Sequence, residues 1–267
     1  MSAMTLSMNA PRALEVRGLG KSFGGIHAVK DISFDVHPGE IVGLIGPNGA
    51  GKTTCFNLIT GFYTPSAGQV RFGGSDVTGR KPYHMARMGI VRSFQKTNIL
   101  KSLTVLENVL TGHYMQARQP LWRTFFPGRA VRDTEAAARE SAERIVRTMG
   151  LAHRMDTPAS VLSCGELRLL EVALALAAKP EILMLDEPAA GLNSQEARQF
   201  GEILKAVRGK LVSAILIVEH NMGLVMGVSD RVVVMHFGQK LAEGTPAQVQ
   251  ADSKVVDAYL GGGGKKV

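Results

Sequence analysis

The stretch of glycines that follows Ile41–Ile45 is the feature that most limits what this chain can fold into. The aliphatic run before it suits a buried strand, and Thr54–Thr60 after it is compatible with a helix. Glycines let the backbone of a turn wrap an anion with its N–H groups, and the following helix points its positive end at the same place. The stretch fits the pattern G-x-x-x-x-G-K-[ST] and therefore predicts a phosphate-binding loop. Its residues are Gly46, Pro47, Asn48, Gly49, Ala50, Gly51, Lys52, Thr53 and Thr54.

The side chains that follow the glycines have separate expected roles. Lys52 can reach the β- and γ-phosphates of a nucleotide, and the Thr53 hydroxyl can hold Mg²⁺. A chance glycine turn is the alternative, but the strand before the loop and the helix after it favour the functional interpretation. A nucleoside triphosphate with Mg²⁺ is therefore the expected ligand, although the loop alone does not choose among kinases, GTPases and transport ATPases.

Hydrophobic patterning predicts an α/β fold. Nearly continuous aliphatic runs are typical of parallel strands covered on both faces, whereas alternating segments suit half-buried antiparallel strands. The pattern therefore predicts a parallel core, a small antiparallel sheet at the front and a helical insert near 97–160. The expected parallel strands are 41–45, 182–185, 214–218 and 232–235, the antiparallel strands are 14–17, 32–36 and 69–72, and the helices include 132–149 and 166–178.

Two adjacent acids follow a buried strand later in the chain. Asp186 ends the run that starts at Ile182, where a carboxylate can hold Mg²⁺ from the side opposite the loop. Glu187 comes one residue later, points the other way, and could orient and polarise an attacking water. Without the phosphate loop, two solvated acids at a strand end would be the simpler interpretation.

A short segment before the predicted helix 166–178 has two compatible interpretations. Ser163 and Glu166 have the S-x-x-E spacing of a capping box, which explains a helix start with no further function. An exposed helix N-terminus with a serine and a glycine is also a ready site for an anion. The segment consists of Leu162, Ser163, Cys164, Gly165 and Glu166.

With these three motifs in this order, the chain resembles the ATP-binding subunits of ABC transporters. The resemblance covers roughly 13–260 and makes Leu162–Glu166 the family's signature, which acts on the ATP of a partner. It also implies that Gln95 touches Mg²⁺ or the water, that His220 contacts the γ-phosphate, and that Phe23 stacks on adenine. Taken alone, Phe23 is more often a core residue, and a single histidine at a strand end is more often structural.

The resemblance implies the fold of a P-loop NTPase, with a RecA-like core, a small antiparallel β subdomain and an α-helical subdomain. It places the core and β subdomain at about 13–96 and 161–245 and the helical insert at about 97–160. A C-terminal helix is expected at about 246–260, and 1–12 and 261–267 are expected to be flexible tails.

A narrower resemblance points to importers of branched-chain amino acids. Asp186–Asn193, Glu219–Met222 and Ser229–Arg231 are similar to the ATPases of those systems. The insert near 113–135, with its aromatic residues, resembles the longer of the two ATPase subunits in those systems. These aromatic residues are Trp122, Phe125 and Phe126.

The sequence also departs from the family pattern. Cys164 and Glu166 replace the more usual Gly or Tyr and Gln of the signature, and Asn193 stands where many members have Asp. Hydrolysis is expected to survive these changes, because the Ser163 hydroxyl and the Gly165 backbone remain. The departures leave the transported substrate open.

The resemblance implies specific partners and a location. ATP is sandwiched between two subunits, with the phosphate loop of one facing the signature of the other, so we expect an ATP-dependent dimer with a related ATPase subunit or a second copy. Membrane permease subunits and, indirectly, a periplasmic binding protein are the further partners, with no nucleic acid. The expected activity is ATP hydrolysis that powers uptake of branched-chain or related amino acids. The chain is expected to be peripheral on the cytoplasmic face of the inner membrane.

Composition leaves other interpretations open. The chain has 31 Lys and Arg against 23 Asp and Glu, a net charge of +8 that admits nucleic acid, an anionic membrane surface or an ordinary solvated surface. No apolar run approaches the roughly 20 residues of a spanning helix, and the N-terminus does not read as a secretory signal. The alternatives are an ABC system for urea, another amide or lipopolysaccharide, a non-transport ABC ATPase acting on nucleic acid or ribosomes, and a small-molecule P-loop kinase.

A final hypothesis concerns the surface from Gln95 to Leu106. Its apolar side chains suit either a contact with a helix of a membrane subunit or ordinary core packing. They include Ile99, Leu100, Leu103 and Val105.

Overall fold

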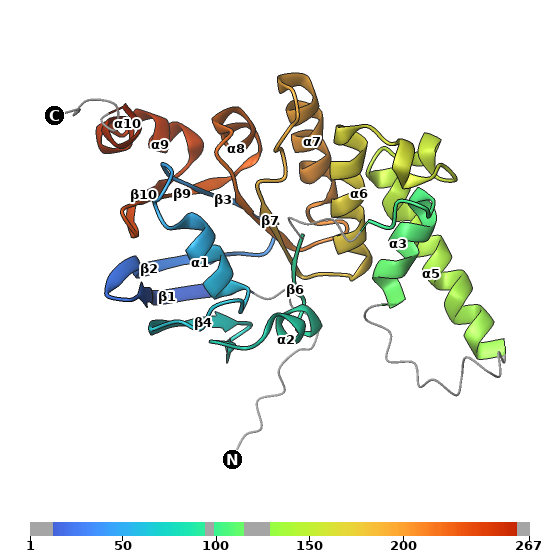
Figure 1. Cartoon of the computed structure of the whole chain (residues 1–267), viewed down its shortest axis with the longest axis horizontal. Coiled ribbons are helices and arrows are strands. Elements are labelled where there is room, and N and C mark those ends of the chain that lie inside the picture. The colour runs from blue at the N-terminus through green and yellow to red at the C-terminus, as the bar shows by residue number, and fades with distance from the viewer. Residues whose placement is uncertain (1–12, 94–98, 115–128, 261–267) are drawn as a thin grey trace, which may run out of the picture.

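The computed structural model describes residues 13–93, 99–114 and 129–260, and it confirms the α/β fold (Figure 1). A six-stranded sheet has the order β10-β9-β3-β8-β7-β6, and a four-stranded antiparallel sheet has the order β2-β1-β4-β5. The strands of the large sheet are β3 Ile41–Ile45, β6 Ile90–Arg92, β7 Ile182–Asp186, β8 Ala214–Val218, β9 Arg231–His236 and β10 Gln239–Gly244. Those of the small sheet are β1 Leu14–Phe23, β2 Ile26–Val36, β4 Ala67–Phe72 and β5 Ser75–Asp76.

The strands β9, β3, β8, β7 and β6 run parallel, and β10 joins β9 in the antiparallel direction. Successive side chains of a strand point to opposite faces. In β7, Leu183 packs into the core on one face of the sheet, while Ile182 and Met184 pack into the core on the other face. Burial on both faces explains why these strands read as continuous aliphatic runs.

Helices cover both faces of the large sheet. In Figure 1, α6, α7 and α8 lie on one side of it, and α1 with the small sheet lies on the other. The helix α3 packs against α5 and α6, which makes a helical layer beyond the end of the sheet. The helices are α1 Lys52–Ile59, α2 Pro82–Arg87, α3 Val105–Tyr114, α5 Arg129–Thr148, α6 Cys164–Ala177, α7 Ser194–Val207 and α8 Met222–Val228, with short 3-10 turns at Ala152–Arg154 and Ala159–Val161. No helix among these described segments is long and apolar enough to cross a membrane.

The C-terminal segment contains two helices where one was predicted over 246–260. The helix α9 covers Pro246–Ala251, and α10 covers Ser253–Leu260. Asp252 lies between them in an extended conformation, which ends the first helix. The two helices pack against β9 and β10, and Val249 and Val255 belong to the same hydrophobic cluster as Ile45, the last residue of β3.

Part of the surface predicted over Gln95 to Leu106 is core instead. Val105 and Leu106 begin α3 and are buried against α5 and α6, because α3 turns this face inward. Leu100 is exposed, and Ile99 is partly buried at the edge of the same core. For Val105 and Leu106, ordinary core packing is therefore the correct interpretation.

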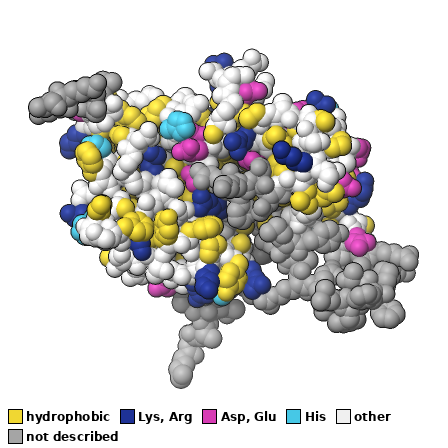
Figure 2. All heavy atoms as spheres, in the orientation of Figure 1, with side chains coloured by type: hydrophobic (Ala, Val, Ile, Leu, Met, Phe, Trp, Pro, Cys, Tyr) yellow, Lys and Arg dark blue, Asp and Glu magenta, His cyan; other side chains and the backbone are white. Residues whose placement is uncertain are grey.

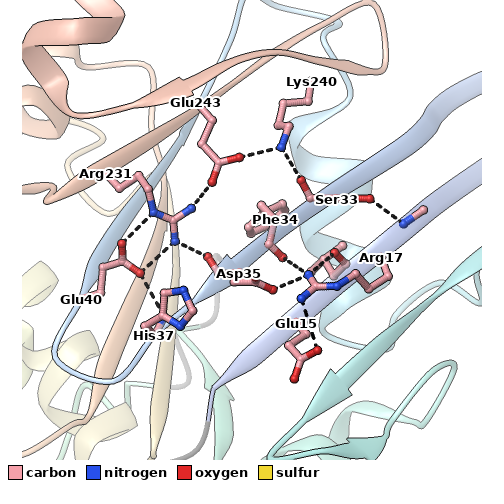
Figure 3. Close-up of polar contacts among 12 residues, drawn as sticks. Glu15, Arg17, Ser33, Phe34, Asp35, His37, Glu40, Arg231, Lys240 and Glu243 are labelled. Carbon is pink, nitrogen blue, oxygen red and sulfur yellow. Dashed lines mark hydrogen bonds and ion pairs between the residues drawn. The ribbon is translucent and has the colours of Figure 1, made fainter.

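A polar network joins the two sheets (Figure 3). Arg231 of β9 donates to both carboxylate oxygens of Glu40, at 2.8 and 2.9 Å, and to the Asp35 carbonyl oxygen of β2 at 2.6 Å. It also pairs with Glu243 of β10, which accepts from Lys240. The planar guanidinium suits several acceptors at once, so one side chain fixes β2 against β9 and β10.

We expect Arg231→Ala to destabilise the fold by about 2–3 kcal/mol, because it leaves Glu40 and the Asp35 carbonyl without their charged donor. Urea unfolding of the purified variant measures this change. The matched control is Arg139→Ala, which removes an exposed pair with Glu143 on α5 and should cost less than about 0.5 kcal/mol. Equal destabilisation by the two variants would show that the network does not hold the sheets together.

Candidate active site

The phosphate loop runs between β3 and α1 as predicted, and its glycines are needed for close backbone contacts. Gly46 has φ +153°, and a Cβ there would lie 2.2 Å from the Met235 carbonyl oxygen. Gly51 has φ +94°, and its Cβ would lie 2.4 Å from the Ala28 carbonyl oxygen. The loop is therefore pressed between β9 and β2, and any side chain at these positions would displace it.

Lys52 is the first residue of α1, and its ammonium group is held inside the loop. Nζ donates to the Gly46 carbonyl at 2.7 Å and to the Pro47 carbonyl at 3.0 Å. Burial lowers the pKa of Lys52, and the nearby carboxylates of Glu187 and Asp186 oppose that shift. The charge is thus already positioned where phosphate oxygens would enter.

A cleft of about 540 Å³ opens over the loop. Its size suits a small organic ligand. Lys52, Thr53 and Thr54 line it together with Glu187, so the structure brings the loop and one of the predicted acids to the same cavity. Further lining residues come from the start of β2 and from the β9–β10 turn, which no sequence motif indicated. They are Ile26, His27, Ala28, Phe237 and Gly238.

Asp186 is buried at the end of β7 and has one paired and one unpaired oxygen. Arg92 Nη2 donates to Oδ2 at 2.8 Å. Oδ1 is buried and has no hydrogen-bond partner among the described residues. Burial raises the pKa of Asp186, and the Arg92 charge opposes this. A buried carboxylate oxygen without a partner is costly unless another group satisfies it, and a hard cation would do so.

No group of three or more His, Cys, Asp or Glu side chains among the described residues is arranged to hold a metal ion. A cation at this site would therefore be shared between few protein ligands and a phosphate group, as Mg²⁺ usually is. Asp186 and Thr53 fit that requirement, because an acid and a hydroxyl supply oxygen ligands.

Glu187 and His220 face each other across the ends of neighbouring strands. Nδ1 of His220 lies 3.8 Å from Oε1 of Glu187, and both side chains are accessible. Glu187 has φ +48°, an uncommon conformation for a non-glycine residue, and its N–H donates to the Val218 carbonyl at 2.8 Å. Strained backbone of this kind persists where neighbouring structure fixes it and is concentrated at functional sites.

Glu219 organises this pair, although sequence reasoning gave it no separate role. It is 1% exposed. Its two oxygens accept from the backbone N–H groups of Ala189 at 2.8 Å, His220 at 2.9 Å and Asn221 at 3.0 Å. The sequence did contain a signal for this role, because an acid directly follows the aliphatic run 214–218. A charge buried at that place requires several hydrogen-bond partners.

The predicted signature lies at the N-terminus of α6, and none of its residues is among those that line the cleft over the phosphate loop. Ser163 and Glu166 form the predicted capping box, with bonds of 3.2 and 2.8 Å. Arg154 adds a bond to Glu166 at 2.8 Å. Burial opposes ionisation of Glu166, but the bonds from Arg154 and Ser163 outweigh it and lower its pKa to about 2. Cys164 and Gly165 follow at the first turn, with the Cys164 thiol exposed.

Asn193 is the N-cap of α7. Its side chain accepts from the backbone N–H groups of Gln195 at 2.9 Å and Glu196 at 3.0 Å. Asn and Asp cap helices about equally well. The departure from Asp at this position therefore keeps the local structure.

Phe23 is a predicted site residue that does not line the cleft. Phe23 ends β1 and packs edge-on against Tyr63, with ring centroids 5.4 Å apart, and it is not among the residues that line the cleft. It is 43% exposed, so it is not the core residue that its type alone suggested. Gln95 lies outside the described residues, as do Trp122, Phe125 and Phe126.

Comparisons of sequence place these features among known proteins. The family profile described as "ABC transporter" matches residues 29–190, and the one described as "Branched-chain amino acid ATP-binding cassette transporter" matches residues 239–265. The chain is 42% identical to the high-affinity branched-chain amino acid transport ATP-binding protein LivG of Escherichia coli K12, over 93% of this chain and 97% of that protein. It is 40% identical to the corresponding protein BraF of Pseudomonas aeruginosa, over the same shares.

Solved structures give the same result. The ADP conformation of MJ1267, an ATP-binding cassette of an ABC transporter, has a TM-score of 0.81 and 34% identity, and the match covers 94% of this chain and 100% of that one. A nucleotide-free ATP-binding cassette from an ABC transporter has a TM-score of 0.79 and 34% identity, with 93% and 98% covered.

We expect Glu219→Ala to reduce stability by about 3 kcal/mol, because it leaves three backbone N–H groups without their acceptor. ATP hydrolysis should fall at least about tenfold, since Glu187 and His220 would lose their fixed placement. Thermal unfolding and phosphate release measure the two effects. Glu202→Ala, which removes an exposed pair with Lys205, should change stability by less than about 1 kcal/mol and leave hydrolysis intact.

Proposed function

This chain belongs to the ABC transporter ATP-binding family, and from that membership we propose that it hydrolyses ATP to drive import of branched-chain or related amino acids. The observation that carries the proposal is the meeting of Lys52, Thr53 and Glu187 in one cleft, with Asp186 beside it. The match of residues 239–265 to the branched-chain family supports this cargo over urea, other amides or lipopolysaccharide. Family membership also argues against a small-molecule kinase.

Binding of the triphosphate falls to the loop and its lysine. The helix α1 begins at Lys52, which lines the cleft, and the N-terminus of a helix favours an anion. The Lys52 ammonium exchanges its contacts with the Gly46 and Pro47 carbonyls for phosphate oxygens, so no lysine charge is left without a partner when the nucleotide leaves. Phe23 at the end of β1 is the proposed stacking partner of adenine, and Gln95 is proposed to sense the metal or the water.

Hydrolysis requires a water aligned with the γ-phosphate. Glu187 accepts a hydrogen bond from that water and polarises the water molecule. The water oxygen then bonds to the γ-phosphorus as the bond from that phosphorus to ADP breaks. His220, 3.8 Å from Glu187, is placed to contact the γ-phosphate as it detaches. Asp186 and Thr53 would hold Mg²⁺, which supplies charge neutralisation on the phosphates when bound.

The site needs a second chain. The signature at the start of α6 is not among the residues lining the cleft over the loop, so a single chain does not complete the proposed sandwich. We infer a dimer with a related ATPase subunit or a second copy, in which Ser163 and Gly165 of one chain approach the nucleotide held by the other. The capped N-terminus of α6 suits an anion.

An apolar groove is the proposed contact with the permease. It has a volume of about 550 Å³ and lies between α2, β6, α3 and α6. Phe62 is 49% exposed and Tyr83 54% exposed at its rim, and large apolar side chains left open in this way mark interaction sites. Ile99 lines the groove, so this end of the predicted surface fits a helix of a membrane subunit. The peripheral position on the cytoplasmic face of the membrane follows from that contact.

Charge distribution does not favour nucleic acid. Figure 2 shows Lys and Arg interspersed with Asp and Glu over the face drawn, without a continuous basic surface. On this face the positive side chains therefore do not form a basic track.

We expect Glu187→Gln to keep ATP affinity and to lower hydrolysis at least about 100-fold, because the amide cannot act as a base. Lys52→Ala should instead lower ATP affinity roughly 10- to 100-fold by removing charge-assisted bonds. Equilibrium binding and phosphate release separate the two effects. Lys205→Ala is the matched control for Lys52, since its ammonium pairs with Glu202 on exposed α7, and both quantities should be unchanged. Normal hydrolysis by Glu187→Gln would refute the assignment.

A photo-crosslinking amino acid at Tyr83 should capture a permease subunit when the transporter is assembled in membranes, because this side chain lies at the rim of the groove. The same group at Val256 on α10, which is also exposed, is the control and should give no such product. Mass spectrometry identifies the captured protein. Capture at Val256 but not at Tyr83 would move the interface away from the groove.

A further inference from the structure

Arg92 connects two regions that have separate proposed roles. It ends β6, the edge strand of the large sheet, and its side chain is largely buried. One amino group donates to Asp186 Oδ2 at 2.8 Å, and the other donates to Asn57 Oδ1 of α1 at 2.6 Å. The guanidinium thus joins the acid that ends β7 to the helix that begins at the phosphate loop.

The same guanidinium lies over two aromatic rings. Its central carbon lies 4.7 Å from the centroid of Phe56 and 5.0 Å from that of Phe62. Phe56 is buried in the core, whereas Phe62 is exposed in the apolar groove, and Arg92 itself lines that groove. Stacking of this kind fixes the plane of a guanidinium and so the direction of its hydrogen bonds.

Asp186 depends on such a fixed partner. Its side chain is fully shielded from solvent, and only the oxygen that faces Arg92 is bonded among the described residues. Rotation about the Cβ–Cγ bond would exchange the bonded and the unbonded oxygen. The hydrogen bond from Arg92 prevents this rotation, so Oδ1 keeps one fixed direction. An oxygen that is to bind a metal ion needs such a fixed direction.

A simple counter-charge role is the competing explanation. Three carboxylates lie close to one another here, those of Asp186, Glu187 and Glu219. Two cations lie near these carboxylates, Lys52 and Arg92. If Arg92 only balanced charge, its removal would make the site more negative and would strengthen attraction for Mg²⁺. If it orients Asp186, its removal would weaken Mg²⁺ binding. The two explanations therefore predict opposite signs.

We propose that Arg92 is a positioning residue that orients Asp186 for the metal of the nucleotide complex, and that its stacking on Phe62 makes this orientation sensitive to the apolar groove. The inference rests on the proposed function and adds a residue to it. Two observations support it: the hydrogen bonds hold both ends of the guanidinium, and one of its aromatic neighbours is part of the groove wall.

The test measures binding of a non-hydrolysable ATP analogue to the isolated subunit while Mg²⁺ is titrated. Arg92→Gln should raise the Mg²⁺ concentration for half-maximal binding about tenfold, the usual scale for the loss of a residue that supports a metal ligand. Metal-free nucleotide binding should be unchanged, because Arg92 does not line the cleft over the loop. Arg92→Lys should recover part of the loss, since a lysine keeps one donor but not the planar stack.

Phe62→Ala extends the test to the groove and covers the case in which Arg92→Gln fails to fold. It removes an exposed ring without touching Asp186, and it should raise the Mg²⁺ requirement about two- to threefold. Val256→Ala is the control, because it also removes an exposed apolar side chain, but one on α10 that does not line the groove. It should leave the Mg²⁺ titration unchanged.

Hydrolysis gives an independent readout. Excess Mg²⁺ should restore the kcat of Arg92→Gln toward the wild-type value, whereas general structural damage would not respond to metal. Tighter or unchanged Mg²⁺ binding by Arg92→Gln, with a normal wild-type titration, would overturn the positioning role alone. A wild-type chain without metal-dependent nucleotide binding would overturn the proposed function and this inference together.

Discussion

The active cleft depends on how closely the backbone of the phosphate loop approaches its neighbours. At Gly46 and Gly51 the loop leaves no room for a side chain, because carbonyl oxygens of β9 and β2 occupy that space. The loop is also bonded to the β9–β10 turn, where the Gly238 N–H donates to the Ala50 carbonyl at 3.0 Å. Both sheets therefore set the shape of the loop, and Arg231 contributes by fixing one sheet against the other.

The acids around the cleft differ in burial, and burial determines what each can do. Glu219 is enclosed and satisfied by backbone N–H groups, so it holds the ends of β7 and β8 together. Asp186 is enclosed but only half satisfied, which suits a ligand of a metal ion. Glu187 is accessible and faces His220, which suits contact with water. Three neighbouring carboxylates thus have three separate environments.

Much of this arrangement could be predicted from the sequence, because it is local. The loop, the acids at the end of β7 and the capping box of α6 each lie within a few consecutive residues. Continuous aliphatic runs indicated the parallel strands β3, β7, β8 and β9 correctly, but the short edge strand β6 was missed. Contacts between distant segments could not be predicted in this way. Arg92 meets Asp186 only through the order of strands in the sheet, and Phe237 reaches the cleft only through a turn. The sequence left the burial of Val105 undecided for the same reason, since an apolar helix start has the same sequence pattern in a core and on a docking surface.

The C-terminal helices give the family-specific part of the chain a structural role. Residues 239–265 match the branched-chain profile, and within them Val249 and Val255 share a hydrophobic cluster with Ile45, which directly precedes the phosphate loop. The C-terminal segment that matches the branched-chain profile therefore shares a cluster with the end of β3, the strand that leads into the phosphate loop. Exchanging this terminus between relatives would therefore change a hydrophobic cluster that also contains the last residue before the phosphate loop.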